Sequence, residues 1–125
     1  MIKKEKYLSA ILAFILWSSW TYFVNYEDNN RYISSSFQGI ASFVITIFMV
    51  QLIIIFNKIF ENSSIYTIAT LTVMVTSSIV FIGHLIINTQ NIFYTIFPTI
   101  IVAFVFSLFI AKRYKESQIK EDNGR

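Results

Sequence analysis

Three long stretches without a charged side chain constrain this chain more than any other feature. Residues 7–26, 32–57 and 62–111 contain no Asp, Glu, Lys or Arg, and they are 20, 26 and 50 residues long. The hydrocarbon core of a bilayer is about 30 Å thick, and a helix of about 20 apolar residues crosses it. The sequence therefore predicts an integral membrane protein rather than a water-soluble domain.

The longest of these stretches contains two spans. Its one run of four consecutive polar residues, at 88–91, divides it into halves that are each long enough to cross a membrane. Backbone polar groups in lipid must find partners within the segment, so spans of this length are helices. We predict an all-α membrane fold with four transmembrane helices in one compact bundle. The predicted spans, within a single domain of residues 1–111, are 7–24, 37–57, 65–87 and 92–111.

The basic residues predict the orientation of the bundle. Nine of the ten lie before the first span, between the second and third, or after the fourth, and only Arg31 lies on the other side. By the positive-inside rule, the side with nine basic residues faces the cytoplasm. We therefore expect a bacterial cytoplasmic (inner) membrane protein with both termini inside. Residues 112–125 are a charged cytoplasmic tail without apolar periodicity, and we expect this tail to be irregular.

Composition excludes several classes of function. The chain has no cysteine, which excludes disulfides, thiolate catalysis and zinc-thiolate sites. Its predicted spans contain no carboxylate, and no Ser-His-Asp arrangement or phosphate-binding glycine loop can be assembled. We therefore expect no enzyme, no cofactor and no metal site. The net charge of +3 comes from basic residues that flank spans, so nucleic acid is not an expected partner.

Polar residues within the spans gather toward the predicted outer side. Those of the second span recur every four residues from Gln38 to Thr46, and those of the third recur every seven from Thr70 to His84. Such spacings place side chains on one helix face. One interpretation is hydrogen bonding between helices, and the other is a shallow outward pocket for a lipid headgroup, a polar solute or a partner helix. The candidate pocket residues are Asn25, Gln38, Ser42, His84, Asn88, Thr95 and Pro98.

His84 is the only histidine of the chain. It lies three residues from the end of its predicted span, about 5 Å deep at 1.5 Å per residue. Its ordinary pKa of about 6.5 would allow a response to pH, and the alternative is a neutral ring that is hydrogen-bonded to Gln38 or Thr95. Pro98 removes one backbone hydrogen bond and bends the fourth span, which would open space beside His84.

Glu27, Asp28 and Arg31 are the only charged residues on the predicted outer side. They form either a solvated turn with pairing between side chains three or four residues apart, or a docking loop for a partner outside the membrane. Both interpretations remain open from the sequence.

Several short segments resemble a loosely defined group of small four-helix bacterial membrane proteins. They are WSSWTYFVN at 17–25, QGIASF at 38–43, Gly83, Asn88 and TIFPT at 95–99. The resemblance covers residues 17–99, rests on residues that are common in membranes, and implies no activity and no functional residues.

The sequence favours a non-enzymatic role for this small multi-pass protein. We expect an accessory or scaffolding subunit whose outer polar face contacts another integral membrane protein, a second copy of the chain or a lipid headgroup. A small oligomeric transporter or channel for a polar solute or lipid is the alternative. A phage-type holin is less favoured because the chain has four spans and no strongly amphipathic helix.

Overall fold

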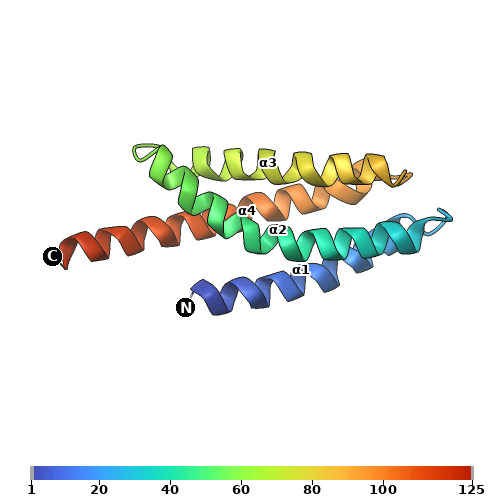
Figure 1. The fold of residues 1–125 in the computed structure, drawn as a ribbon, viewed down its shortest axis with the longest axis horizontal. Helices are drawn as coiled ribbons and strands as arrows, with labels where there is room; N and C mark the ends of the chain where they lie inside the picture. The colour runs from blue at the N-terminus through green and yellow to red at the C-terminus, as the bar shows by residue number, and fades with distance from the viewer. Residues whose placement is uncertain (1, 125) are drawn as a thin grey trace.

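A computed structural model describes residues 2–124 of the chain, with the side chains of all except residues 2, 3 and 5. It contains four helices, and no strand occurs within 2–124. Each helix is long and apolar enough to cross a membrane, so the predicted all-α four-helix fold is confirmed (Figure 1). The helices are α1 (Ile2–Val24), α2 (Arg31–Ile59), α3 (Ile65–Ile86) and α4 (Ile92–Asn123).

The helices extend beyond the predicted spans at several ends. Helix α2 begins at Arg31 rather than at residue 37, and α4 continues to Asn123 rather than ending at 111. The expectation of an irregular tail was therefore wrong. Residues 112–123 are rich in Lys, Glu, Gln and Arg, which favour helices, and a helix that is already formed at residue 111 lengthens without a new nucleation step.

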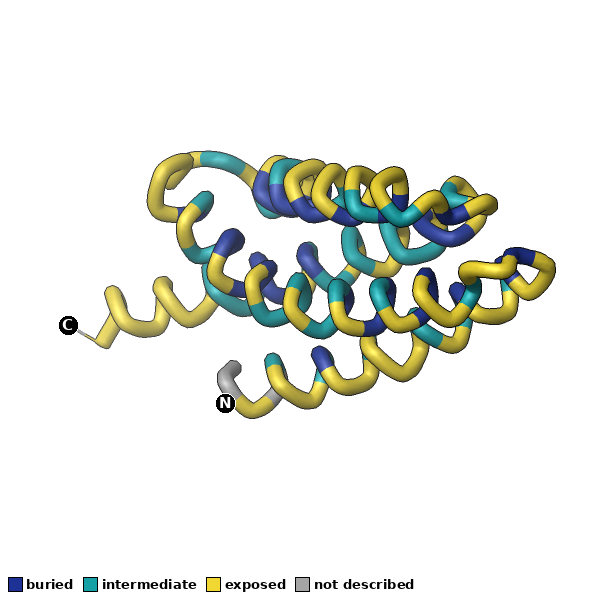
Figure 2. Tube along the Cα trace, turned by 45° about the vertical axis from the view of Figure 1, so that its right-hand side comes forward, coloured by how far each residue is buried: buried dark blue, intermediate teal, exposed yellow. Residues whose placement is uncertain are grey.

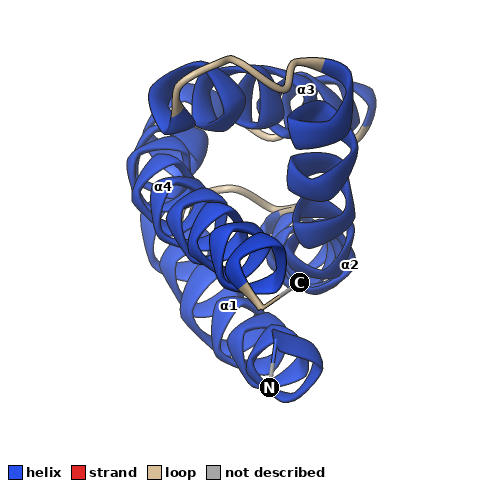
Figure 3. Ribbon diagram, turned by 90° about the vertical axis from the view of Figure 1, so that its left-hand side faces the viewer, coloured by secondary structure: helices blue, strands red, loops and turns tan. Residues whose placement is uncertain are grey.

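Successive helices run in opposite directions, so their connections alternate between the two ends of the bundle. The end with the α1–α2 and α3–α4 connections is called the loop end, and the end with both termini and the α2–α3 connection is called the terminal end (Figure 1). Helix α1 packs beside α2, α3 packs beside α4, and α1 and α3 lie diagonally opposite each other (Figure 3).

The terminal end has an apolar core that α1 does not join. Six buried side chains from the other three helices form it. Helix α1 instead packs closely against α2 at Gly39, where an added Cβ would lie 3.0 Å from Ser18 Cβ and 3.1 Å from the Phe14 ring. The core residues are Met49, Val50, Ile53, Ile68, Ile110 and Ala111.

The outer surface of the bundle is largely apolar. Large hydrophobic side chains such as Leu8, Ile40, Met74 and Val105 are exposed on all four helices, and most of α1 is exposed (Figure 2). In a water-soluble protein such a continuous apolar surface would be unusual. It fits contact with the hydrocarbon of a lipid bilayer.

Candidate functional site

A chain of hydrogen bonds around His84 crosses the loop end of the bundle. His84 is fully buried, with Nε2 2.6 Å from Gln38 Oε1 and Nδ1 2.8 Å from Thr89 Oγ1. Gln38 Nε2 donates to Ser42 Oγ at 3.1 Å, and the hydroxyls of Ser34 and Thr89 are 2.8 Å apart. These five residues are called the His84 network, which joins α2, α3 and the α3–α4 connection.

The partners of the imidazole determine its tautomer. Gln38 uses its amide nitrogen toward Ser42, so its carbonyl oxygen faces His84 and only accepts. In the neutral ring Nε2 therefore carries the proton, and Nδ1 accepts from the hydroxyl of Thr89. Thr89 in turn accepts from Ser34. Each polar atom of the ring is thus satisfied by a side chain of the bundle.

The end of α3 places Thr89 against His84. The N–H of Thr89 donates to the carbonyl of His84 at 3.1 Å, and the N–H of Asn88 donates to the carbonyl of Leu85 at 3.3 Å. With φ at 59° for Asn88, these bonds form a Schellman motif, in which a left-handed residue reverses the chain. Asn88 therefore has a structural role here. Sequence reasoning missed Thr89, although an Asn after an apolar helix is a recognisable signal for this motif.

Phe37 and Gly83 enclose the imidazole. The Phe37 ring meets the His84 ring edge-on, with 5.0 Å between their centroids. A Cβ on Gly83 would lie only 2.1 Å from Phe37 Cζ. Glycine at this position is therefore required for the ring to lie against α3.

A second set of hydrogen bonds joins α1 to the start of α4. The side-chain nitrogen of Asn25 donates to Thr95 Oγ1 at 2.8 Å and to the carbonyl of Thr21 at 3.0 Å. Its side-chain oxygen accepts from the N–H of Asn91 at 3.1 Å, and Asn91 Nδ2 donates to the carbonyl of Val24 at 3.1 Å. These five residues are called the Asn25 network. Of the two expected partners of His84, Gln38 is present, whereas Thr95 binds Asn25 instead.

Pro98 leaves one backbone carbonyl of α4 free to accept a hydrogen bond from α1. A residue at this position would normally donate its N–H to the carbonyl of Tyr94, four residues earlier, but proline has no N–H. That carbonyl accepts instead from the indole nitrogen of Trp20 on α1 at 3.0 Å. The missing helical bond is replaced by a bond between helices.

Asp28 holds the two loop-end connections together. It is only 6% exposed, and its carboxylate oxygens accept from the backbone N–H groups of Asn30 at 2.9 Å and Gln90 at 3.3 Å. Within the expected docking loop, Asp28 is therefore turned inward as a structural residue.

Glu27 and Arg31, by contrast, lie toward the surface. The Arg31 guanidinium lies over the rings of Tyr22 and Tyr32, at 4.5 and 5.3 Å from their centroids. It also donates to the carbonyl of Tyr26 at 3.0 Å, and the Tyr26 hydroxyl donates to the Glu27 carboxylate at 3.1 Å. Arg31 thus packs on aromatic rings in the interfacial position typical of tyrosine.

Most of the predicted pocket residues are turned toward one another. Five are buried within the two networks, while Asn88 is exposed at its turn and Pro98 is half-buried on α4. The polar stripe expected from Thr70 to His84 was wrong at its first residue, because Thr70 is exposed. The buried face of α3 passes through Thr72 and Thr76 instead. Seven residues are slightly less than two full turns of 3.6 residues, so positions seven apart drift gradually around the helix.

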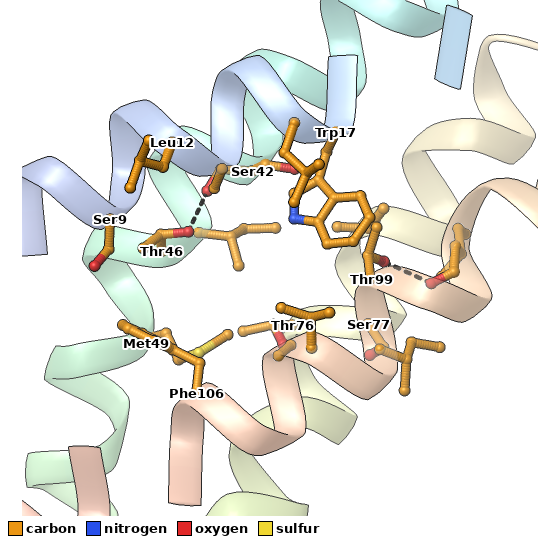
Figure 4. Close-up of a pocket in the computed structure, with 18 residues that line it drawn as sticks. Ser9, Leu12, Trp17, Ser42, Thr46, Met49, Thr76, Ser77, Thr99 and Phe106 are labelled. Atoms are coloured by element: carbon orange, nitrogen blue, oxygen red, sulfur yellow. Dashed lines mark hydrogen bonds between the residues drawn. The ribbon is translucent and has the colours of Figure 1, made fainter. Parts of the chain in front are cut away.

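A hollow lies deeper in the bundle than the predicted pocket, with Ser42 as the one predicted residue that lines it. It has a volume of about 270 Å³ and is lined by all four helices (Figure 4). We call it the α1–α4 groove. Its lining includes Ser9, Leu12, Leu16, Trp17, Ser42, Thr46, Met49, Thr76, Ser77, Val102, Ala103 and Phe106.

The groove opens sideways between α1 and α4. Leu12 and Leu16 on α1 are 59% and 53% exposed and Val102 on α4 is 47% exposed, whereas Met49 on α2 and Thr76 on α3 are buried. Helices α2 and α3 therefore form the floor, and α1 and α4 form the two sides of the mouth. These residues lie in candidate membrane spans, so the mouth is part of the apolar outer surface of the bundle.

No group of three or more potential metal ligands among His, Cys, Asp and Glu occurs in the described part of the chain. Comparisons with models of protein families, with curated proteins and with solved structures found no match to this chain.

Proposed function

We propose that this chain is a non-catalytic accessory or scaffolding subunit of a bacterial cytoplasmic membrane, which acts by lateral contact with another membrane component. The observation that carries the proposal is the contrast between a closed loop end and a groove that opens sideways. Asn25, Gln38 and His84 at the loop end bind other groups of the bundle, while the α1–α4 groove faces the bilayer. Molecules within the bilayer are the ones that can reach it.

The chemistry of the groove favours contact over transport. A path for a polar solute needs polar groups or water along its length, whereas the groove is lined mainly by aliphatic and aromatic side chains such as Leu12, Met49 and Phe106. Of the His84 and Asn25 networks, only Ser42 lines the groove. A scaffold needs neither a polar path nor reactive groups.

Gentle purification from native membranes, followed by mass spectrometry of bound proteins and lipids, tests this proposal. We expect a stoichiometric partner protein, and a photo-crosslinking amino acid at Leu16 to capture it or a bound lipid more efficiently than one at Val44. Val44 is the matched control because it is exposed on α2 and does not line the groove. Equal yields at the two positions, with no partner retained, would contradict the proposal.

A small oligomeric transporter is the second candidate function. The hydroxyl groups of Ser9, Thr46 and Thr99 along the groove are the observation in its favour. Flux of a polar solute in proteoliposomes that contain only this chain would favour transport over the accessory role. Abrupt lysis timed by accumulation of the overexpressed protein would instead indicate a holin.

Orientation is tested with single cysteines, because the natural chain has none. Asn29→Cys lies in the α1–α2 connection and Lys120→Cys near the end of α4, and both positions are exposed. A membrane-impermeant maleimide applied to intact cells should label residue 29 and leave residue 120 unlabelled until the cells are lysed. The opposite pattern would contradict cytoplasmic termini.

A further inference from the structure

The α1–α4 groove is elongated along α1. Its lining on α1 extends from Ser9 to Trp17, a rise of about 12 Å at 1.5 Å per residue. Its volume is about 270 Å³, and most of the side chains that line it are aliphatic or aromatic.

An acyl chain fits such a groove. A methylene group is similar in size to a water molecule, for which a cavity of this kind needs about 15 Å³, so the groove has room for a run of methylenes from one acyl chain. The mouth faces hydrocarbon, where lipid chains are the abundant molecules. Of the lining residues on α1, Trp17 is the nearest to the loop end and Ser9 the nearest to the terminal end (Figure 4). A chain that lies along this lining can therefore place its headgroup at the terminal end.

The charge at the terminal end selects the headgroup. That end has nine basic residues against five acidic ones, whereas the loop end has one basic residue against two acidic ones. Lys6 precedes Ser9 by three residues, which places it on the α1 face that lines the groove. Basic clusters beside a span attract anionic lipids, and a lipid whose chain lies in the groove would place its phosphate near Lys6.

From these observations we propose that the α1–α4 groove binds one acyl chain of an anionic glycerophospholipid, with the headgroup at the terminal end beside Lys6. This inference rests on the proposed lateral contact within the bilayer and names the ligand of one surface. The bound acyl chain fills the space between α1 and α4 and so completes the packing of α1 against the bundle. A partner protein, if retained, then contacts a lipid-filled surface.

Native mass spectrometry of the purified full chain tests the proposal, with phosphatidylglycerol and phosphatidylcholine of the same acyl composition as probes. We expect one phosphatidylglycerol per chain to survive activation, with phosphatidylcholine retained about tenfold less, a difference of about 1.4 kcal/mol. Equal retention of both lipids, or retention of neither, would overturn the proposal.

Two variants that fill the groove sharpen the test. Ala103→Phe fills the interior, and Leu12→Trp covers the mouth from a position that is already 59% exposed and so tolerates a larger side chain. Both should reduce phosphatidylglycerol retention at least about tenfold, whereas Val44→Phe on the exposed surface of α2 should retain it fully. Retention by folded Leu12→Trp at the wild-type level would overturn the groove as the binding site.

The headgroup is tested separately. Lys6→Gln should reduce the preference for phosphatidylglycerol over phosphatidylcholine, while Lys120→Gln, an exposed basic residue beyond the groove, should leave it unchanged. Identical losses in the two variants would overturn the placement beside Lys6. Loss of a partner protein alone, with lipid retention intact, would count against the accessory function and not against the lipid site. A partner polypeptide displaced by Leu12→Trp, with no lipid bound to the wild type, would instead assign the surface to a protein.

Discussion

The two ends of the bundle are held together by different interactions. At the loop end, buried Asn25, Gln38 and His84 bind side chains and carbonyls of neighbouring segments. At the terminal end, the core contacts of α2, α3 and α4 are mainly apolar, with Ile53 and Ile68 fully buried. The polar contacts there are fewer, with Ser107 donating to Met49 Sδ and Lys115 to the carbonyl of Ser63. Helix α1 is bonded to α4 at the first end, and the hollow separates the two helices farther along.

This difference shows which interactions fix the helix arrangement. Within a bilayer, apolar packing gains little from the hydrophobic effect, because lipid tails are as apolar as the side chains. Hydrogen bonds are directional and specify one set of partners, so the networks at the loop end favour the pairing of α2 with α3 and of α1 with α4. The terminal end is left with close packing on one side and an open groove on the other. Four substitutions test this contrast.

The largest effect is expected from His84→Ala. It removes two hydrogen bonds, leaves Gln38 Oε1 without a partner and Thr89 Oγ1 with Ser34 alone, and creates a cavity beside Phe37. We expect the free energy of unfolding to fall by about 3 kcal/mol, measured by denaturant titration in mixed micelles. Thr70→Ala on the exposed face of α3 is the control, and a loss no greater than for this control would show that the His84 network does not stabilise the loop end.

Gly83→Ala should have the next largest effect. The new methyl group would overlap the Phe37 ring, which is already packed on His84, so we expect a loss of about 2 kcal/mol from overpacking. Gly39→Ala, where the nearest side-chain atom is 3.0 Å away, should cost less. The double variant Gly83→Ala with Phe37→Leu should recover part of the loss, and full additivity of the two changes would contradict a direct clash.

Ile53→Ala tests the terminal end. In water such a truncation loses both the transfer free energy and a cavity term, but in the bilayer mainly the cavity term remains, so we expect a loss of about 1.5 kcal/mol. The same unfolding titration measures it. If Ile53→Ala proved more destabilising than His84→Ala, the apolar core rather than the hydrogen-bond networks would dominate the stability of the bundle.

The smallest effect is expected from Trp20→Phe, which removes the bond to the Tyr94 carbonyl. Its loss should be about 1 kcal/mol. Pro98→Ala restores an N–H that donates to the same carbonyl within α4, so Trp20→Phe should cost less in that background. A double-mutant cycle measures this coupling, and a coupling of zero would contradict the exchange of one donor for the other.

Much of the fold could be predicted from the residue pattern. The charge-free stretches located four spans, and the polar run at 88–91 located the break between the last two. Helix ends were less predictable, because charged residues that follow a span can extend it into water, as residues 112–123 do. These side chains are solvated, so the segment has no apolar pattern from which its helix could be predicted.

The candidate site was predictable in part. The pairing of His84 with Gln38 follows from two buried polar groups at the same depth, and it was one of the two expectations for that ring. Thr89 was missed because its contact depends on the left-handed turn at Asn88. The bond from Trp20 to the carbonyl freed by Pro98 depends on α1 lying beside α4, which no local pattern indicates.

The sequence by itself determined that the chain forms four apolar helices, because periodicity and charge decide where a helix can meet lipid. It also indicated five of the buried polar residues that form the two networks, Asn25, Gln38, Ser42, His84 and Thr95. Only the tertiary structure decided which of them pair, and that a groove lined by all four helices opens between α1 and α4. The physical reason is that hydrogen-bond partners and cavities depend on distances between helices that are far apart in the chain.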